Sequence, residues 1–140
     1  MNGEVFVDTN IWLYAVLDSP QERKKHKKAR DFLRTLYVTG FKIVVSAQVI
    51  NELYVNLLKN GIPEAKVRDV CKEVMKNRFV NIEKITIEKA WNFREKYNFS
   101  YWDSLIVAAA WLANCETLFS EDMQDGLIVD GQVKILNPLR

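Results

Sequence analysis

A short apolar segment that ends on a carboxylate constrains this chain more than any other feature. Residues 5–7 (Val-Phe-Val) are β-branched or aromatic, and the polar residues 8–10 (Asp-Thr-Asn) separate them from a second apolar run over residues 11–17. The pattern predicts a buried strand at 5–7, a turn at 8–10 and a short, well-buried helix that ends near Asp18. Because a carboxylate beside a buried strand is costly unless something compensates it, Asp8 needs an explanation.

Helices and strands are predicted to alternate along the rest of the chain. Ser19-Pro20-Gln21-Glu22 is typical of a helix start, with Ser as N-cap, Pro at N1 and Glu at N3. Ser46, Thr86 and Ser100 are predicted N-caps of later helices, and Gly61 is a predicted C-terminal stop. The predicted helices cover residues 20–38, 47–60, 63–77, 86–97 and 100–114, and the further predicted strands cover residues 42–45, 79–83, 117–119 and 133–136.

This alternation with short connections predicts an α/β fold, a three-layer α/β/α sandwich around a mainly parallel central sheet. A length of 140 residues and a hydrophobic content of 49% predict one domain, residues 1–140, with a proper core. Ligands bind such sheets outside the carboxyl ends of the strands. We therefore expect the chemistry of the chain at that edge.

Composition sets further bounds. The formal net charge is only +2, so net charge makes no case for a nucleic-acid partner. Cys71 and Cys115 have no CxxC partner, which favours buried, reduced thiols in a reducing compartment. The chain shows no signal-peptide pattern, and its longest apolar stretch, residues 105–113, is too short to span a bilayer. We expect a cytoplasmic protein with no membrane partner.

Four acids each lie beside an apolar element: Asp8, Glu52, Asp103 and Asp122. Each has a purely structural interpretation. Asp8 could cap the following helix, Asp103 could complete a capping box with Ser100, Asp122 could be a turn residue and Glu52 a solvated helix residue.

Together the four acids predict a shared site, because the expected fold brings all of them to one rim of the sheet. Carboxylates gathered in a cleft repel each other, and a hard cation relieves that repulsion. Mg²⁺ or Mn²⁺ prefers oxygen ligands and suits the hydrolysis of phosphodiesters. The pattern therefore indicates a metal-dependent phosphodiester hydrolase.

Competing chemistries have little support. His26 is the only histidine and falls on the expected core face of its helix, which argues against histidine-based acid–base catalysis. No nucleotide-binding glycine motif occurs. The basic run over residues 23–30 fits either a solvated helix face or a phosphate-contacting patch. The tryptophans, with Tyr14, are expected to be core or dimer contacts more often than base-stacking platforms.

Four segments in register resemble the PIN-domain family, and most closely the VapC-type toxin ribonucleases of toxin–antitoxin systems. The matching segments are residues 5–10, 46–52, 100–110 and 120–124, and residues 135–138 are similar to the family's last strand and tail. The resemblance implies a parallel α/β/α sandwich, which agrees with the fold predicted from periodicity.

The resemblance also implies a function for the residues that match. Asp8, Glu52, Asp103 and Asp122 would form the acidic Mg²⁺ or Mn²⁺ site, with Asn10 and Ser120 as polar supports. Asp125 would be either an outer ligand or a turn residue. Members of the family usually cleave RNA and often form homodimers, and toxin members are silenced by an antitoxin protein whose tail lies across the acidic cleft.

Two other functions stay open at this point. A non-catalytic RNA- or protein-binding module could keep the fold, although all four acids are present. A phosphatase-like hydrolase with an aspartyl nucleophile would also place an acid after the first strand. Against the phosphatase, the residue two positions after Asp8 is Asn10 rather than a second aspartate.

Overall fold

A computed structural model describes residues 3–140 and shows a six-stranded sheet in the order β3-β2-β1-β4-β6-β5. All neighbouring strands are parallel except β5, which pairs antiparallel with β6. The strands are β1 (Glu4–Val7), β2 (Lys42–Ser46), β3 (Arg78–Val80), β4 (Thr117–Phe119), β5 (Ile128–Val129) and β6 (Val133–Leu136). The predicted α/β fold with a mainly parallel sheet is confirmed.

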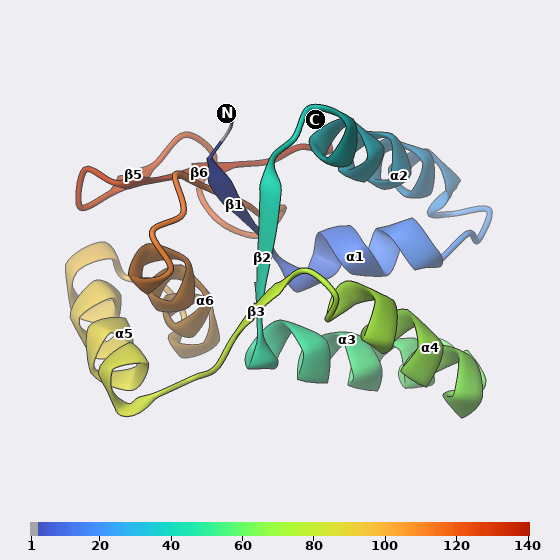
Figure 1. Cartoon of the computed structure of the whole chain (residues 1–140), viewed down its shortest axis with the longest axis horizontal. Helices are drawn as coiled ribbons and strands as arrows, with labels where there is room; N and C mark the ends of the chain where they lie inside the picture. Colours follow the sequence, from blue (N-terminus) through green and yellow to red (C-terminus); the bar gives the residue numbers. More distant parts are fainter. Residues whose placement is uncertain (1–2) are drawn as a thin grey trace.

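Six helices cover the sheet in the described part of the chain. In Figure 1, α5 and α6 lie on one side of the strands, and α1 to α4 lie on the other. The helices are α1 (Thr9–Val16), α2 (Arg23–Val38), α3 (Ala47–Lys59), α4 (Glu64–Val74), α5 (Lys84–Tyr97) and α6 (Tyr101–Leu112). No helix within residues 3–140 combines the length and the apolar character that crossing a bilayer requires.

The core lies on both faces of the central strands. Phe6, Val44 and Leu118, from β1, β2 and β4, are fully buried. On α6, every residue from 104 to 110 is buried, and three of them are alanines. Small side chains let this helix pack closely, and a helix that is apolar around most of its surface is expected to be enclosed.

The start of α2 differs from its prediction. Residues 20–22 form a turn, the Glu22 N–H donates to the Ser19 carbonyl at 3.0 Å, and the helix begins at Arg23. Proline suits position i+1 of a β-turn as well as N1 of a helix, so the same residues are compatible with both structures.

Other predicted boundaries were also wrong: α1 begins at Thr9, inside the predicted turn, and α6 ends at Leu112 rather than at 114. The strand predicted at 79–83 ends at Val80, and α4 ends at Val74 rather than near residue 77. Thr86 is not the N-cap of α5. Its hydroxyl accepts from the backbone N–H of Glu83, which places Thr86 in the first turn. The two-residue β5 was not predicted, because two residues carry no detectable periodicity.

The position of β1 between β2 and β4 decides where the polar residues meet. The pairing of Val7 with Phe119 continues as a hydrogen bond from the Asp8 N–H to the Phe119 carbonyl at 3.0 Å. Asp8 and Ser120 therefore follow adjacent parallel strands at the same level. Ser46 ends β2 and caps α3 through a 3.4 Å bond from the Val49 N–H, so α3 also starts at this edge.

Candidate active site

The four acids singled out in the sequence line one cavity of about 310 Å³ at the carboxyl edge of the sheet, here called the acidic cavity. Its lining residues are Asp8, Thr9, Asn10, Leu13, Gln48, Glu52, Asn56, Asp103, Ile106 and Asp122. Asp8 is buried, Glu52 and Asp103 are half-buried, and Asp122 is exposed. The cavity thus opens from the edge of the sheet toward solvent.

Asp8 is the deepest acid, at 5% exposure. Its Oδ1 accepts from the Thr9 N–H at 2.7 Å, which makes it the N-cap of α1, and its Oδ2 accepts from the Ser120 hydroxyl at 2.9 Å. Burial raises the pKa of Asp8 from 3.8 to about 7. The hydrogen bonds oppose this rise, and the charges of Glu52 and Asp103 add to it. Asp8 therefore caps α1 and at the same time lines the cavity that the other three acids line.

Two polar side chains orient Glu52 from opposite sides. The Thr9 hydroxyl donates to Oε1 at 2.8 Å, and the Gln48 amide donates to Oε2 at 3.1 Å. The same Gln48 amide donates to the Trp102 carbonyl at 3.0 Å, which joins α3 to the first turn of α6. These two hydrogen bonds fix the Glu52 carboxylate, so Glu52 is not a free solvated residue.

Asp103 stands in the first turn of α6. Its backbone N–H donates to the Ser100 hydroxyl at 3.2 Å, so the predicted N-cap is confirmed. Burial raises the pKa of the Asp103 carboxyl, and the charges of Asp122 and Glu52 raise it further, against the lowering effect of Ser100. The carboxylates are therefore close enough to disfavour one another's ionisation.

Ser120 and Asn10 link the acids on the β4 side. The Ser120 hydroxyl is fully buried; it donates to Asp8 and accepts from the Asp122 N–H at 3.2 Å. The Asn10 amide donates to Asp122 Oδ2 at 2.8 Å, while its own Oδ1 is buried with no hydrogen-bond partner in the structure. Both residues predicted as supports thus contact the acids.

The donor set of the acidic cavity suits a hard cation. Its lining holds carboxylate, amide and hydroxyl oxygens and no lysine, arginine or histidine among the described residues. Within residues 3–140, no three acidic, histidine or cysteine side chains are close enough to ligate one ion directly. A small hard cation that keeps several of its waters needs only one or two direct carboxylates and reaches the others through water. The cavity fits that mode of binding.

Asp125 lies outside this arrangement. Its Oδ1 accepts from the Asn137 N–H at 2.7 Å, and its Oδ2 lies 3.3 Å from the Arg140 guanidinium. It is not among the residues that line the acidic cavity. Of the two interpretations left open for Asp125, the contacts favour the structural one, because this carboxylate holds the end of the chain against the loop after β4.

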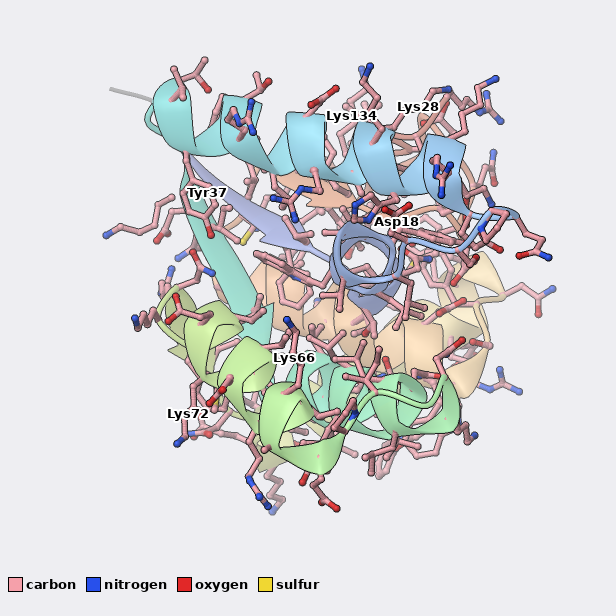
Figure 2. All side chains as sticks on the ribbon, turned by 90° about the vertical axis from the view of Figure 1, so that its right-hand side faces the viewer. Asp18, Lys28, Tyr37, Lys66, Lys72 and Lys134 are labelled. Atoms are coloured by element: carbon pink, nitrogen blue, oxygen red, sulfur yellow. The ribbon has the colours of Figure 1, made fainter. Side chains whose placement is uncertain are left out.

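The basic run on α2 is partly engaged in structural contacts. Lys25 pairs with Glu121 at 2.8 Å and lies over the Tyr14 ring, and Lys28 donates to the Leu139 carbonyl at 3.2 Å. Figure 2 shows Lys28 on α2, and Lys66 and Lys72 on α4, on a face where α1 is seen end-on between the two helices. The Lys25–Glu121 pair ties α2 to the residue next to Asp122.

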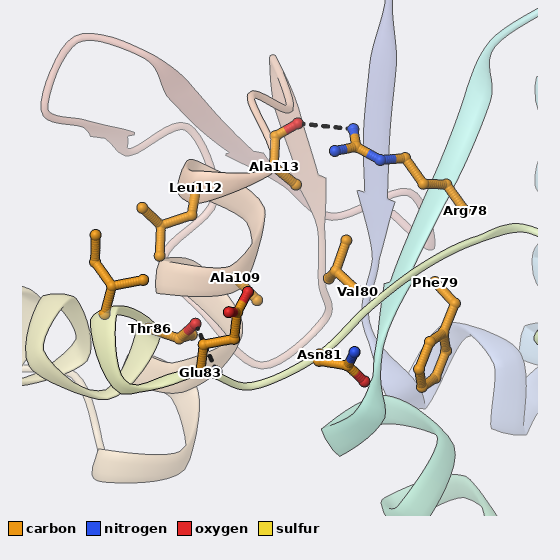
Figure 3. Close-up of a pocket in the computed structure, with 10 residues that line it drawn as sticks. Arg78, Phe79, Val80, Asn81, Glu83, Thr86, Ala109, Leu112 and Ala113 are labelled. Carbon is orange, nitrogen blue, oxygen red and sulfur yellow. Dashed lines mark hydrogen bonds between the residues drawn. The ribbon is translucent and has the colours of Figure 1, made fainter.

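A separate cavity of about 440 Å³ lies between residues 78–86, which include β3, and the C-terminal part of α6 (Figure 3). Arg78 at its edge donates to a carboxylate oxygen of Glu4 at 2.6 Å and to the Ala113 carbonyl at 3.0 Å. It shares no lining residue with the acidic cavity. These contacts tie β3 to β1 and to the end of α6, which is a structural role.

Thr9 and Gln48 contact Glu52 but were not among the predicted site residues. Both had a signal in the sequence. Thr9 follows Asp8 directly, and Gln48 stands four residues before Glu52, which places the two side chains on one face of a helix. The contact of Thr9 with Glu52 could not be named from the sequence, because it depends on packing between α1 and α3.

Comparisons with known proteins agree with this fold. The PIN domain family matches residues 5–124. Three solved structures share the fold: a toxin–antitoxin complex from Klebsiella pneumoniae, VapBC2 from Rickettsia felis bound to a DNA fragment from their promoter, and VapC20 from Mycobacterium tuberculosis, a toxin that cleaves the sarcin–ricin loop.

The likeness to these structures is one of fold. For the Klebsiella complex the TM-score is 0.71 at 21% identity, over 96% of this chain and 97% of the other. For VapBC2 it is 0.70 at 16% identity, over 96% and 98%, and for VapC20 it is 0.65 at 16% identity, over 84% and 91%. A comparison with curated proteins finds no match.

Proposed function

Because the chain belongs to the PIN domain family, we propose that it is an endoribonuclease that hydrolyses RNA phosphodiesters with Mg²⁺ or Mn²⁺. One observation carries this proposal. Asp8, Glu52, Asp103 and Asp122 come from four separate segments, yet they line one cavity without a cationic side chain among its described residues. A divalent cation is the partner that such a set of oxygens favours.

The four acids are expected to have different roles, according to how deeply each is buried. A divalent cation supplies Lewis acidity toward the phosphodiester and toward the attacking water. Asp8, fixed by the Thr9 N–H and the Ser120 hydroxyl, would hold the cation at the sheet edge. Glu52 and Asp103 would bind its waters, and the exposed Asp122 would face the incoming strand. Preset hydrogen bonds limit how far these carboxylates must move when the cation binds.

Cleavage of RNA in Mg²⁺ or Mn²⁺ tests the proposal. Asp8→Asn and Asp103→Asn should each lose most of the activity, because each removes a charge that the cation requires. Asp69→Asn is a matched control, since Asp69 is exposed on α4 and outside the acidic cavity. Wild-type rates in both site variants would refute the assignment. Absence of metal binding in a calorimetric titration near neutral pH would favour a non-catalytic binding module.

We further propose that the protein is the toxin of a type II toxin–antitoxin pair, acts in the cytoplasm and forms a homodimer. The fold similarity to a toxin–antitoxin complex and to VapBC2 supports an antitoxin protein as partner. Induced expression should arrest growth, and co-expression with the product of a small adjacent reading frame should restore it. Sedimentation of the purified protein measures its mass in solution, which should be that of a dimer. Growth unaffected by active enzyme would contradict the toxin role.

A further inference from the structure

A second cavity of about 410 Å³ adjoins the acidic cavity and is here called the Trp102 cavity. It is lined by Gln48, Asn51, Glu52, Ile82 and Trp102. Gln48 and Glu52 line both cavities, so the two cavities meet at these side chains. A ligand bound at the acids can therefore extend into the Trp102 cavity without leaving the protein surface.

Trp102 is a large aromatic residue, yet it is 62% exposed. It directly precedes Asp103 in the first turn of α6, and its carbonyl accepts from the Gln48 amide. Its indole makes a T-shaped contact with the Tyr101 ring, with centroids 5.2 Å apart and planes at 80°. This contact restrains the indole, while much of its surface stays open beside the site.

The charges around the two cavities limit what can bind there. No lysine or arginine lines either cavity in the described chain, whereas four acids line the acidic cavity and one of them, Glu52, also lines the Trp102 cavity. The side chains at this position therefore offer a polyanion no ion pair, and a base beside the acids needs an attraction that does not depend on charge. An exposed indole supplies it, because any nucleobase can stack on an aromatic face.

The shared wall adds a polar group. The Gln48 side chain is 7% exposed, and its Oε1 has no hydrogen-bond partner in the structure, although its Nε2 bonds both Glu52 and the Trp102 carbonyl. This amide oxygen is enclosed in the protein and not open to a ligand, so the contribution of Gln48 is to tie the Glu52 carboxylate to the Trp102 backbone through its Nε2.

We propose that the Trp102 cavity is a nucleobase subsite, in which an unpaired base next to the phosphate at the acidic cavity stacks on the Trp102 indole. The proposal rests on the proposed function, because it takes the ligand to be an RNA strand. A subsite of this kind requires that the base beside the cleaved phosphodiester is unpaired. Cleavage is then expected in single strands, loops and bulges rather than in continuous duplex.

Binding and cleavage measured together test the subsite. The probe is a labelled hexauridylate, and a matched series carries one abasic residue at each position in turn. Binding is followed by fluorescence anisotropy in Ca²⁺, and cleavage by kinetics in Mn²⁺. Trp102→Ala should weaken binding and raise KM roughly ten-fold with kcat nearly unchanged. Trp102→Phe should recover most of the affinity, and the salt dependence of binding should not change, because no phosphate contact is lost.

The abasic series identifies the contact. One abasic position should weaken binding to the wild type but not to Trp102→Ala, because the stacking partner is already absent. Trp91→Ala is the matched control, since Trp91 is 57% exposed on α5 and lines neither cavity. An unchanged affinity in Trp102→Ala overturns the subsite, and so does an equal abasic penalty in both proteins. Loss of self-association or of antitoxin binding with RNA binding intact would overturn it in favour of a protein contact.

The outcomes also separate this proposal from the proposed function. A wild type that cleaves RNA, with Trp102→Ala unaffected, refutes the subsite alone. A wild type that shows the position-specific abasic effect without cleavage supports the subsite and refutes the nuclease. A wild type that neither binds nor cleaves RNA refutes both.

Discussion

Asp8→Asn should make the metal-free protein more stable above neutral pH while abolishing its activity. Burial raises the Asp8 pKa from 3.8 to about 7, so the folded protein favours the protonated acid. The stability that this acid contributes is fully present below about pH 4 and is lost as pH rises through about 7. At ~1.36 kcal/mol per pKa unit, the charged form costs about 4 kcal/mol above pH 7.

Asparagine removes that charge, but it also weakens one of the hydrogen bonds that Asp8 accepts. It keeps one carbonyl oxygen, whereas Asp8 accepts from both the Thr9 N–H and the Ser120 hydroxyl. A weakened hydrogen bond of this kind costs about 1 kcal/mol. The variant should therefore gain about 3 kcal/mol at pH 8, which raises the melting temperature by roughly 10 °C. Near pH 4 the gain should vanish, because Asp8 is then protonated in the wild type.

Urea unfolding in EDTA from pH 4 to 8.5 measures this difference. The exposed Asp69→Asn control should show no comparable pH-dependent gain. Added Mn²⁺ should stabilise the wild type, by about 2.7 kcal/mol at a hundred times its Kd, and should have little effect on Asp8→Asn. The reasoning is refuted if Asp8→Asn is no more stable than the wild type at pH 8, or if the difference does not change with pH.

Three further substitutions probe the contacts around the site. Thr9→Val removes the hydroxyl that orients Glu52 and should lower metal affinity or cleavage roughly 10- to 100-fold, measured by calorimetry and kinetics, with a small effect on folding. Lys25→Met breaks a partly exposed 2.8 Å pair with Glu121, so urea unfolding should show a loss below about 1 kcal/mol. Leu57→Ala empties a fully buried position on α3 and should cost about 2–5 kcal/mol in the same assay, a cost that a well-packed core makes unavoidable.

Local patterns in the sequence determined most of the elements and the identity of the acids. The strand at β1, the Ser46 and Ser100 caps and the apolar α6 all follow from short-range spacing. These features depend on interactions among residues a few positions apart, so the sequence alone carries them. The same local chemistry left Ser19-Pro20 ambiguous, because a turn and a helix start use the same residues.

Only the tertiary structure decided what those acids meet. The order of the strands places β1 beside β4, and this brings Ser120 to Asp8 across 112 residues of sequence. The same packing turns Asp125 toward Arg140 and leaves Trp102 exposed beside the acids. Strand order and side-chain contacts arise from packing between distant segments, which no local pattern encodes. The sequence thus determined which groups the site can use, and the fold determined their depth, their partners and their neighbours.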